Sequence, residues 1–182
     1  MLNIKFADGK QVSVEAGTTV YDAAAAAENI SREVLAATVN GELVGLTTPL
    51  TADSEIKLHT FEDKEGKKVF RHTASHILAQ AVKRLYPEVK LTIGPAVDDG
   101  FYYDFDSDLP FDAAMLTAIE AEMKKIVKEN LKLERFTLPR DEAKKLMEEK
   151  GEPYKVLLID RVPEGEEISF YKQGDFTDLC AG

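Results

Sequence analysis

Asn3-Ile-Lys-Phe-Ala-Asp-Gly-Lys-Gln-Val-Ser-Val-Glu15 alternates apolar and polar side chains on either side of an Asp8-Gly9 pair. A period of two residues is typical of a half-buried β-strand. The Asp-Gly pair supplies the positive φ values that a tight hairpin turn demands. This stretch therefore predicts a strand, a turn and a second strand at the start of the chain.

The residues that follow extend this hairpin into a small strand-rich fold. Thr18 and Thr19 offer hydroxyl caps to the alanine-rich run 20–27, which has high helical propensity. A second hairpin turn is predicted at Asn40-Gly41, and a further strand at 55–59. A β-hairpin, one helix and returning strands together predict a ubiquitin-like β-grasp.

A domain boundary is predicted where the chain becomes charged and loses its apolar periodicity. Residues 62–68 are charged and contain a glycine, which is typical of a linker. We therefore assign 1–62 to the β-grasp domain and 63–182 to a second domain. No catalytic constellation occurs in the first domain, and we expect a structural role for its only histidine, His59.

Size and charge limit the classes of protein that fit this chain. Its 182 residues are 44% hydrophobic, which is enough for one large or two small domains. Charges interrupt every apolar stretch before the roughly 20 residues of a membrane span, and no signal peptide is recognisable, so we expect a cytoplasmic protein. The net charge of −10 opposes binding to a phosphate backbone.

Two histidines four residues apart begin the second domain, in Phe70-Arg-His-Thr-Ala-Ser-His-Ile77. On a helix this spacing points His72 and His76 in the same direction. The helix is predicted by one apolar stripe: Ala74, Ile77, Leu78, Ala81, Val82 and Leu85. Both histidines fall nearly opposite the stripe, which leaves two interpretations, a solvated surface and a cleft.

The remainder of the second domain mixes helices and strands without a regular repeat. Helices are predicted at 110–131 and 139–150, and the first has an apolar face of Leu116, Ile119, Met123, Ile126 and Val127. Strands are predicted at 91–95, 100–105, 155–160 and 168–171. This irregular order favours an α+β fold, with the histidine helix packed on a sheet.

The histidine pair alone makes an incomplete metal site, because catalytic zinc takes three protein ligands and structural zinc four. The residue after His72 is Thr73 and not the glutamate of a zincin protease, which argues against that class. Cys180 is the only other soft ligand. His72, His76 and Cys180 could form a three-ligand pocket or a metal-free proton-transfer site. A Cys-x-x-x-His pattern would end beyond Gly182, so we expect the second domain to be truncated.

Several motifs in order resemble a known family. They are Arg71-His-Thr-Ala-Ser-His76, Ile93-Gly-Pro95, Gly100-Phe-Tyr-Tyr-Asp104, Tyr154-Lys-Val156 and Asp178-Leu-Cys180. Together they resemble the N-terminal region of bacterial threonyl-tRNA synthetase, and 39–44 resembles its TGS domain. The resemblance implies a TGS domain followed by an editing domain, which hydrolyses Ser-tRNA(Thr) and is related to that of alanyl-tRNA synthetases and to free-standing deacylases.

The resemblance also implies what this chain would lack. The domain that binds ATP, Mg²⁺, threonine and Zn²⁺ would lie beyond Gly182, with the anticodon-binding domain, so this chain should not charge tRNA. The partners implied are these remaining synthetase domains and the acceptor end of tRNA(Thr), and the full-length enzyme would be a homodimer. Because the chain is acidic, we expect it to bind tRNA weakly on its own.

Editing has a physical reason in this family. Serine lacks one methyl group of threonine, and a missing methyl gives only about 1–3 kcal/mol of discrimination. A pocket that accepts threonine therefore admits some serine. A second site that is too tight for the methyl group can hydrolyse the smaller ester.

The resemblance assigns roles residue by residue. His72 would transfer protons, and Lys155 would supply a cation; without the resemblance, Lys155 would be interpreted as a surface lysine opening a strand. Tyr103 and Asp178 would contact the substrate, Asp178 at the seryl amine or hydroxyl, while His76 and Cys180 would line the pocket. The resemblance implies a site without metal; any bound Zn²⁺ would be held by His72, His76 and Cys180.

Two other classes of function remain open from the sequence. The chain could be a non-catalytic module in which a TGS domain docks on RNA or on a protein. It could instead be a zinc-dependent free-standing aminoacyl-tRNA deacylase. The TGS-like segment and the Tyr154-Lys-Val156 motif favour the synthetase over the second alternative.

Overall fold

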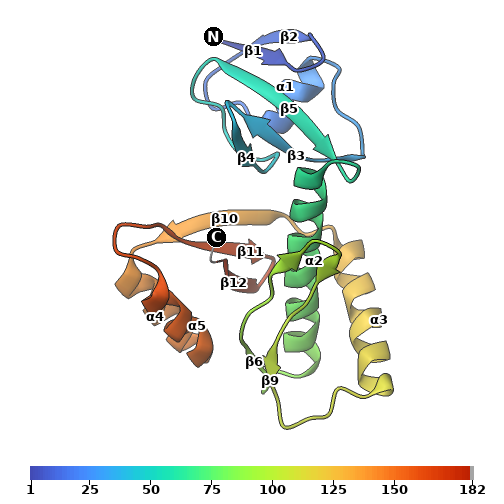
Figure 1. Ribbon diagram of the computed structural model, residues 1–182, viewed down its shortest axis with the longest axis vertical. Coiled ribbons are helices and arrows are strands. Elements are labelled where there is room, and N and C mark those ends of the chain that lie inside the picture. The colour runs from blue at the N-terminus through green and yellow to red at the C-terminus, as the bar shows by residue number, and fades with distance from the viewer. Residues whose placement is uncertain (181–182) are drawn as a thin grey trace. The chain divides into compact units, whose positions relative to one another are not determined.

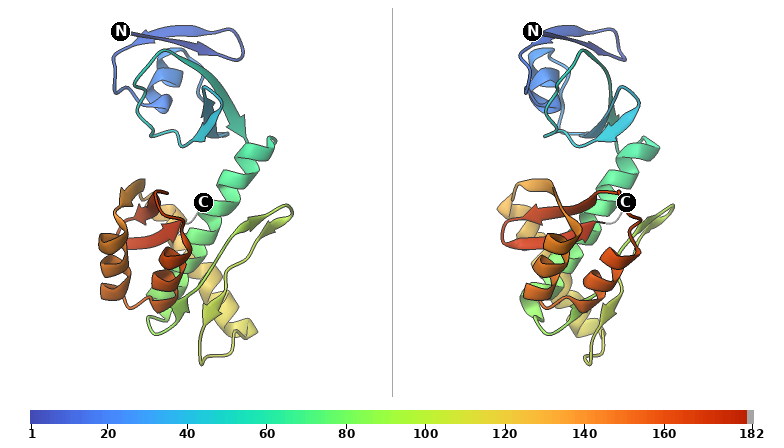
Figure 2. Two further views of the ribbon diagram at one scale, coloured as in Figure 1. Left: turned by 60° about the vertical axis from the view of Figure 1, so that its left-hand side comes forward. Right: turned by 90° about the vertical axis from the view of Figure 1, so that its left-hand side faces the viewer.

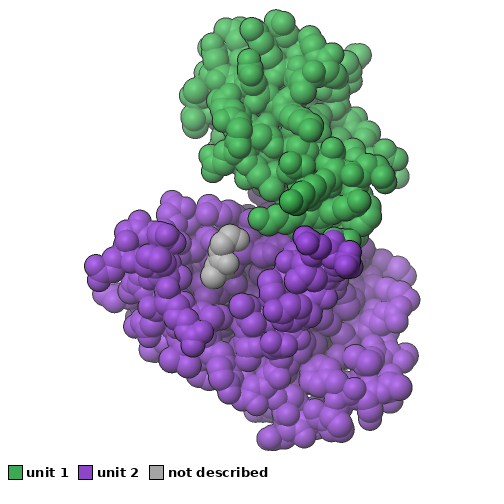
Figure 3. Space-filling view, viewed as in Figure 1, with its two compact units in different colours: residues 1–71 green, residues 72–182 purple. Residues whose placement is uncertain are grey.

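A computed structural model describes residues 1–180 of the chain. The chain divides into two compact units, Met1–Arg71 and His72–Gly182 (Figure 3). The division lies inside one helix, α2 (Lys64–Leu85), which begins within the charged segment predicted to be a linker. The domain boundary between residues 62 and 63 stays a prediction.

The first unit is built on a five-stranded sheet of order β2-β1-β5-β3-β4 (Figure 1). Its strands are β1 (Leu2–Phe6), β2 (Gln11–Val14), β3 (Val34–Val39), β4 (Glu42–Val44) and β5 (Ser54–Thr60). β1 and β5 pair in parallel, and the other neighbours are antiparallel. With α1 (Val20–Ala26), this arrangement confirms the predicted β-grasp.

Local sequence signals set the turns of this unit. Asn40 and Gly41 both have positive φ, at 49° and 89°, as the tight turn between β3 and β4 requires. The Thr19 hydroxyl accepts a hydrogen bond from the backbone of Asp22 and so caps α1. His59 is buried on β5, with Nε2 2.6 Å from the Thr38 hydroxyl, which agrees with a structural role.

In the second unit, α2 packs its apolar stripe against α3 (Ala113–Glu129), which runs beside it in Figure 1. Their core contains Ala81, Val82, Ile119 and Ile126, together with Met115 and Val89. The helix predicted at 110–131 is shorter, because Asp112 caps its start and Asn130 ends it in a left-handed conformation.

Three residues of the predicted apolar faces are exposed. Leu116 and Val127 are 54% and 61% exposed, and Leu85 at the end of α2 is also exposed. A helix that packs on a single neighbour buries only part of its apolar side chains, and those at the edges of the apolar stripe stay exposed. The predicted apolar faces are therefore wider than the faces that the structure buries.

A narrow ribbon follows α2 in place of the two longer strands predicted. Its pieces are β6 (Lys90–Leu91), β7 (Ala96–Val97), β8 (Gly100–Phe101) and β9 (Phe105–Asp106), with β6 paired to β9 and β7 to β8. The pairing is interrupted near Pro95, which has no N–H to donate. The Tyr103 ring crosses the ribbon at this point, where a Cβ on Gly94 would lie 2.1 Å from it.

The C-terminal part of the second unit is a three-stranded antiparallel sheet of β10 (Leu133–Leu138), β11 (Ile168–Gln173) and β12 (Phe176–Cys180). Figure 2 shows α4 (Arg140–Glu149) and α5 (Pro153–Arg161) against it. Phe136, Phe170 and Leu179 lie opposite one another in register and pack on these helices. Because side chains alternate along strands, the neighbouring residues face the other way.

The strand predicted at 155–160 is wrong, because these residues belong to α5. Pro153 begins this helix, and Lys155 and Ile159, four residues apart, are buried on one face while Leu157 is 56% exposed. A short apolar run does not distinguish a buried strand from a buried helix by periodicity alone. The predicted strand at 168–171 and helix at 139–150 are confirmed by β11 and α4.

Within the described residues 1–180, no helix is both long enough and apolar enough to cross a membrane. This finding agrees with the interruption of apolar stretches by charge in the sequence.

Replacing Gly66 by alanine tests the packing at the start of α2. A Cβ at this position would lie 1.8 Å from the backbone oxygen of Thr60, so backbone must move. We expect Gly66→Ala to lower the free energy of unfolding by about 2 kcal/mol, measured by chemical denaturation. Gly45→Ala is the matched control, because nothing lies within 4 Å of its Cβ. Equal stability of the two variants would contradict the prediction.

Candidate active site

The second unit brings together all the site residues predicted from the sequence. They are His72, His76, Tyr103, Lys155, Asp178 and Cys180, joined by the contacts described below. Helix α2, the ribbon after it, helix α5 and strand β12 each contribute side chains. Segments more than a hundred residues apart in the sequence therefore meet in one cluster.

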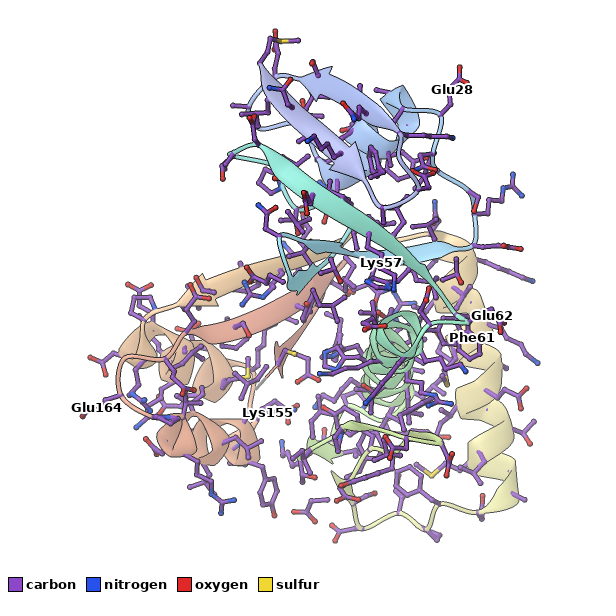
Figure 4. The ribbon with its side chains drawn as sticks, turned by 45° about the horizontal axis from the view of Figure 1, so that its top comes forward. Glu28, Lys57, Phe61, Glu62, Lys155 and Glu164 are labelled. Atoms are coloured by element: carbon purple, nitrogen blue, oxygen red, sulfur yellow. The ribbon has the colours of Figure 1, made fainter. Side chains whose placement is uncertain are left out.

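The cluster is organised around a buried carboxylate on β12. Asp178 is 1% exposed, and its Oδ1 lies 2.9 Å from Nζ of Lys155, which is also buried. Its Oδ2 accepts a 2.7 Å hydrogen bond from the Tyr103 hydroxyl and lies 3.1 Å from Nδ1 of His76. Lys155 also donates to the Tyr103 oxygen at 2.9 Å. Lys155 projects from α5 (Figure 4).

These partners keep Asp178 ionised. Burial by itself raises the pKa of a carboxyl group, but the Lys155 ammonium and the bond to His76 outweigh it and hold the pKa of Asp178 at about 2. Burial and the neighbouring Asp178 charge together raise the pKa of Tyr103 well above its usual range. Tyr103 is therefore a neutral hydrogen-bond donor, and Asp178 is an anion.

The two histidines form a chain that leads away from this anion. Because Asp178 is ionised, Nδ1 of His76 donates to it, and Nε2 of His76 faces His72. Nε2 of His72 lies 3.0 Å from that atom and 2.9 Å from the Cys180 sulfur. Nε2 of His72 is thus the atom at which the contacts to His76 and to Cys180 meet.

Cys180 is a thiol and not a nucleophilic thiolate in this environment. Burial and the nearby Asp178 charge raise its pKa to about 11. The same sulfur lies against His72, so its position suits a pocket wall or a metal ligand.

The donor set also fits a zinc ion. One ligand atom from each of His72, His76 and Cys180 lies within 4.8 Å of the others. Zinc bonds of roughly 2.0–2.3 Å in a tetrahedral site separate ligand atoms by somewhat more than the 2.9–3.0 Å seen here, so a small outward shift would be needed. The Asp178 carboxylate behind His76 is the kind of outer partner that orients zinc-bound histidines.

One residue of the cluster was missed in the sequence. The Tyr171 ring on β11 lies against both imidazoles, with ring centroids 5.8 Å from His72 and 5.6 Å from His76. Tyr171 pairs in register with Asp178, so its side chain lies on the same face of the sheet. The sequence segment 168–171 predicted a strand, but the pairing that aims Tyr171 at the histidines depends on β12, which was not predicted.

The structure decides between the two interpretations of the histidine pair. His76 is 4% exposed, so the solvated-surface interpretation is wrong. The polar face of α2 lies against β12, opposite the face packed on α3. The alternative of Lys155 as a surface lysine is wrong as well, because it lies buried in the first turn of α5.

The sequence of this chain is similar to those of known proteins. Residues 2–60 match the model of the TGS domain. Over its full length the chain is 58% identical to a threonine--tRNA ligase of Clostridium tetani, 60% to one of Clostridium botulinum strain Hall and 57% to one of Clostridium kluyveri. The chain matches the N-terminal region of threonine--tRNA ligases. It spans 29% of the length of these relatives. The resemblance to threonyl-tRNA synthetase inferred from the motifs is confirmed.

Acid should reveal the buried Asp178 carboxylate. Its folded pKa of about 2 is below its ordinary value of 3.8, so its contribution to stability is present above pH 4 and is lost as the pH falls toward 2. We expect the wild type to lose about 2 kcal/mol more of its unfolding free energy between pH 5 and pH 2 than Asp178→Asn does. Denaturant titrations across this range measure the difference. Asp108→Asn, which changes an exposed residue, should follow the wild type.

Proposed function

We propose that this chain is the proofreading part of a threonyl-tRNA synthetase and hydrolyses Ser-tRNA(Thr). The observation that supports this most directly is the convergence of His72, Lys155, Asp178, Tyr103 and Cys180 in one polar cluster. This cluster occurs in a chain that matches threonine--tRNA ligases throughout. In this proposal, residues 1–62 are the TGS domain and 63–182 are the editing domain.

The proposed reaction is attack of water on the ester between serine and the 3′-terminal adenosine. His72 transfers the proton, either from the water or through the ribose hydroxyl beside the ester. Nε2 of this imidazole lies 3.0 Å from His76 and 2.9 Å from the Cys180 sulfur, so a proton on this ring has neighbouring polar atoms to exchange with. Asp178 orients His76 so that its Nε2 faces His72.

Lys155 is proposed to stabilise the negative charge that develops on the ester carbonyl oxygen. Its ammonium is fixed by Asp178 and by the Tyr103 hydroxyl, so little reorganisation is needed during the reaction. The predicted contact of Asp178 with the seryl amine or hydroxyl stays a prediction, since the three bonds described above already link this carboxylate to protein side chains. Tyr103, His76 and Cys180 are proposed to line the substrate pocket.

The remaining partners follow from the same proposal. Aminoacylation, with its ATP, Mg²⁺ and Zn²⁺, would belong to synthetase domains outside this chain, and the complete enzyme would be a cytoplasmic homodimer. The partner of the described site is the acceptor end of tRNA(Thr). We propose weak tRNA binding for the isolated chain because its net charge is −10.

Replacing His72 tests the proposed function. We expect His72→Ala to slow hydrolysis of Ser-tRNA(Thr) by about 10²- to 10⁴-fold, the usual contribution of a proton-transfer group. The release of serine and of threonine from the two aminoacylated tRNAs is measured, and the wild type should favour the serine ester.

His59→Gln is a matched control, because it alters a histidine in the other compact unit. It should leave the rate unchanged. A wild-type rate equal to the uncatalysed rate would contradict the proposal and favour the non-catalytic binding module.

A zinc-dependent deacylase is the second candidate, favoured by the convergence of His72, His76 and Cys180. We expect no metal in the active chain, so a chelator should change the rate of serine release by less than twofold. Metal content after purification, and the Co²⁺–thiolate absorption of a cobalt-loaded sample, supply a readout independent of activity. Stoichiometric zinc that Cys180→Ala removes, with chelator-sensitive hydrolysis, would establish the second candidate instead.

A further inference from the structure

The site-facing side of the three-stranded sheet continues beyond the catalytic cluster. Asp178 on β12 pairs in register with Tyr171 on β11, and Tyr171 pairs with Arg135 on β10. Directly paired residues of antiparallel strands project from the same face of a sheet. Arg135, Tyr171 and Asp178 therefore form one row, which runs from the buried carboxylate to the outer strand.

Arg135 is the outer end of this row. Its side chain is 51% exposed, whereas Asp178 is buried, so the row leads from solvent into the cluster. Among the described residues on this face of β10, β11 and β12, Arg135 is the only cation. Burial raises the pKa of Tyr171 and of the Cys180 thiol, and the Arg135 guanidinium acts in the opposite direction on both, which places its charge close to the site.

The other cation near this row, Lys155, is held inside the cluster. Lys155 lies 2.9 Å from the Asp178 carboxylate and donates to Tyr103. Arg135 has an exposed partner, Glu167, with an N–O distance of 3.3 Å and with 71% of the glutamate side chain exposed. An exposed ion pair of this kind is worth at most about 1 kcal/mol, so an incoming anion can displace it.

We propose that Arg135 binds the phosphate on the 5′ side of the 3′-terminal adenosine and so anchors the aminoacylated nucleotide at the mouth of the site. This inference rests on the proposed function, because it assigns the substrate anion that lies next to the hydrolysed ester. A guanidinium presents paired N–H donors that match two phosphate oxygens.

The spacing of the row agrees with such a substrate. Two strand separations of about 4.8 Å place the Arg135 backbone roughly 10 Å from that of Asp178, and the long arginine side chain can shorten this span. In a nucleotide, the 5′-phosphate and the 3′-oxygen are separated by one sugar ring. Tyr171 lies between the two ends of the row, against the histidines, where the sugar and the seryl group would pass.

Two non-hydrolysable analogues test the anchor without requiring turnover. They are 3′-seryl-amido-3′-deoxyadenosine and the same molecule with a 5′-phosphate, and calorimetry measures the Kd of each. We expect the phosphate to lower the wild-type Kd by roughly three- to fivefold at low salt and by less at high salt. Arg135→Gln should remove this gain and leave the Kd of the analogue without phosphate unchanged. Arg135→Lys should retain part of the gain.

Lys172→Gln is the matched control. Lys172 is an exposed cation on β11 in the neighbouring row, and it projects from the opposite face of the same sheet. It should retain the full gain from the phosphate, because it carries the same charge as Arg135 but projects away from the site.

The outcomes separate this inference from the proposed function. Equal wild-type affinity for both analogues, or an unchanged gain in Arg135→Gln, overturns the phosphate anchor while binding of the seryl nucleoside continues to support the site. Equal losses in Arg135→Gln and Lys172→Gln also overturn it, because they indicate a general effect of net charge. Failure of the wild type to bind either analogue overturns both.

Discussion

The buried ion pair between Lys155 and Asp178 is the constraint on which the second unit depends. Two charges lose their hydration when they are buried, and this cost is offset only where each has close and well-oriented partners. Here the partners come from four separate parts of the unit: His76 from α2, Tyr103 from the ribbon, Lys155 from α5 and Asp178 from β12. One apolar core fixes the position of α2, and a second core fixes the positions of α5 and the sheet. These positions bring the polar side chains within bonding distance of one another. Stability and site geometry therefore depend on the same few bonds.

Interactions between sequence neighbours explain what the sequence could predict. The hairpin turn at Asn40-Gly41, the α1 cap at Thr19 and the helical spacing of His72 and His76 are local features, and all appear in the structure. The strand β10 was not predicted, because its pairing with β11 is a long-range interaction, whereas β12 forms a local hairpin with β11 through Gly174, a turn signal that was overlooked. The helix α5 was mistaken for a strand, because four apolar residues in a row fit either element. His72, His76 and Cys180 were found from helical spacing and ligand chemistry, and Tyr103, Lys155 and Asp178 through motifs of a family. Tyr171 belongs to none of those motifs and became visible only through its strand partners.

Several cations of this acidic chain are paired inside the fold. Lys83 pairs with the buried Glu152, and Arg84 forms two hydrogen bonds to Glu129. Lys155 pairs with Asp178. Each of these cations links two parts of the fold through a nearby carboxylate. The carboxylate offsets its charge, so the cation adds little to the electrostatic potential at long range. These paired cations would therefore contribute little to electrostatic steering of an incoming anion.

The short strand β12 gives the second unit a further property. Asp178 and Cys180 face the histidines, while Leu179 between them belongs to the core against α4 and α5. A slip of one residue in the pairing with β11 would exchange these faces, placing a carboxylate in the apolar core and a leucine against the imidazoles. A molecule with a misaligned β12 would lose both its apolar core and its polar cluster. A form that is folded but has the wrong residues in the cluster is therefore not a stable alternative.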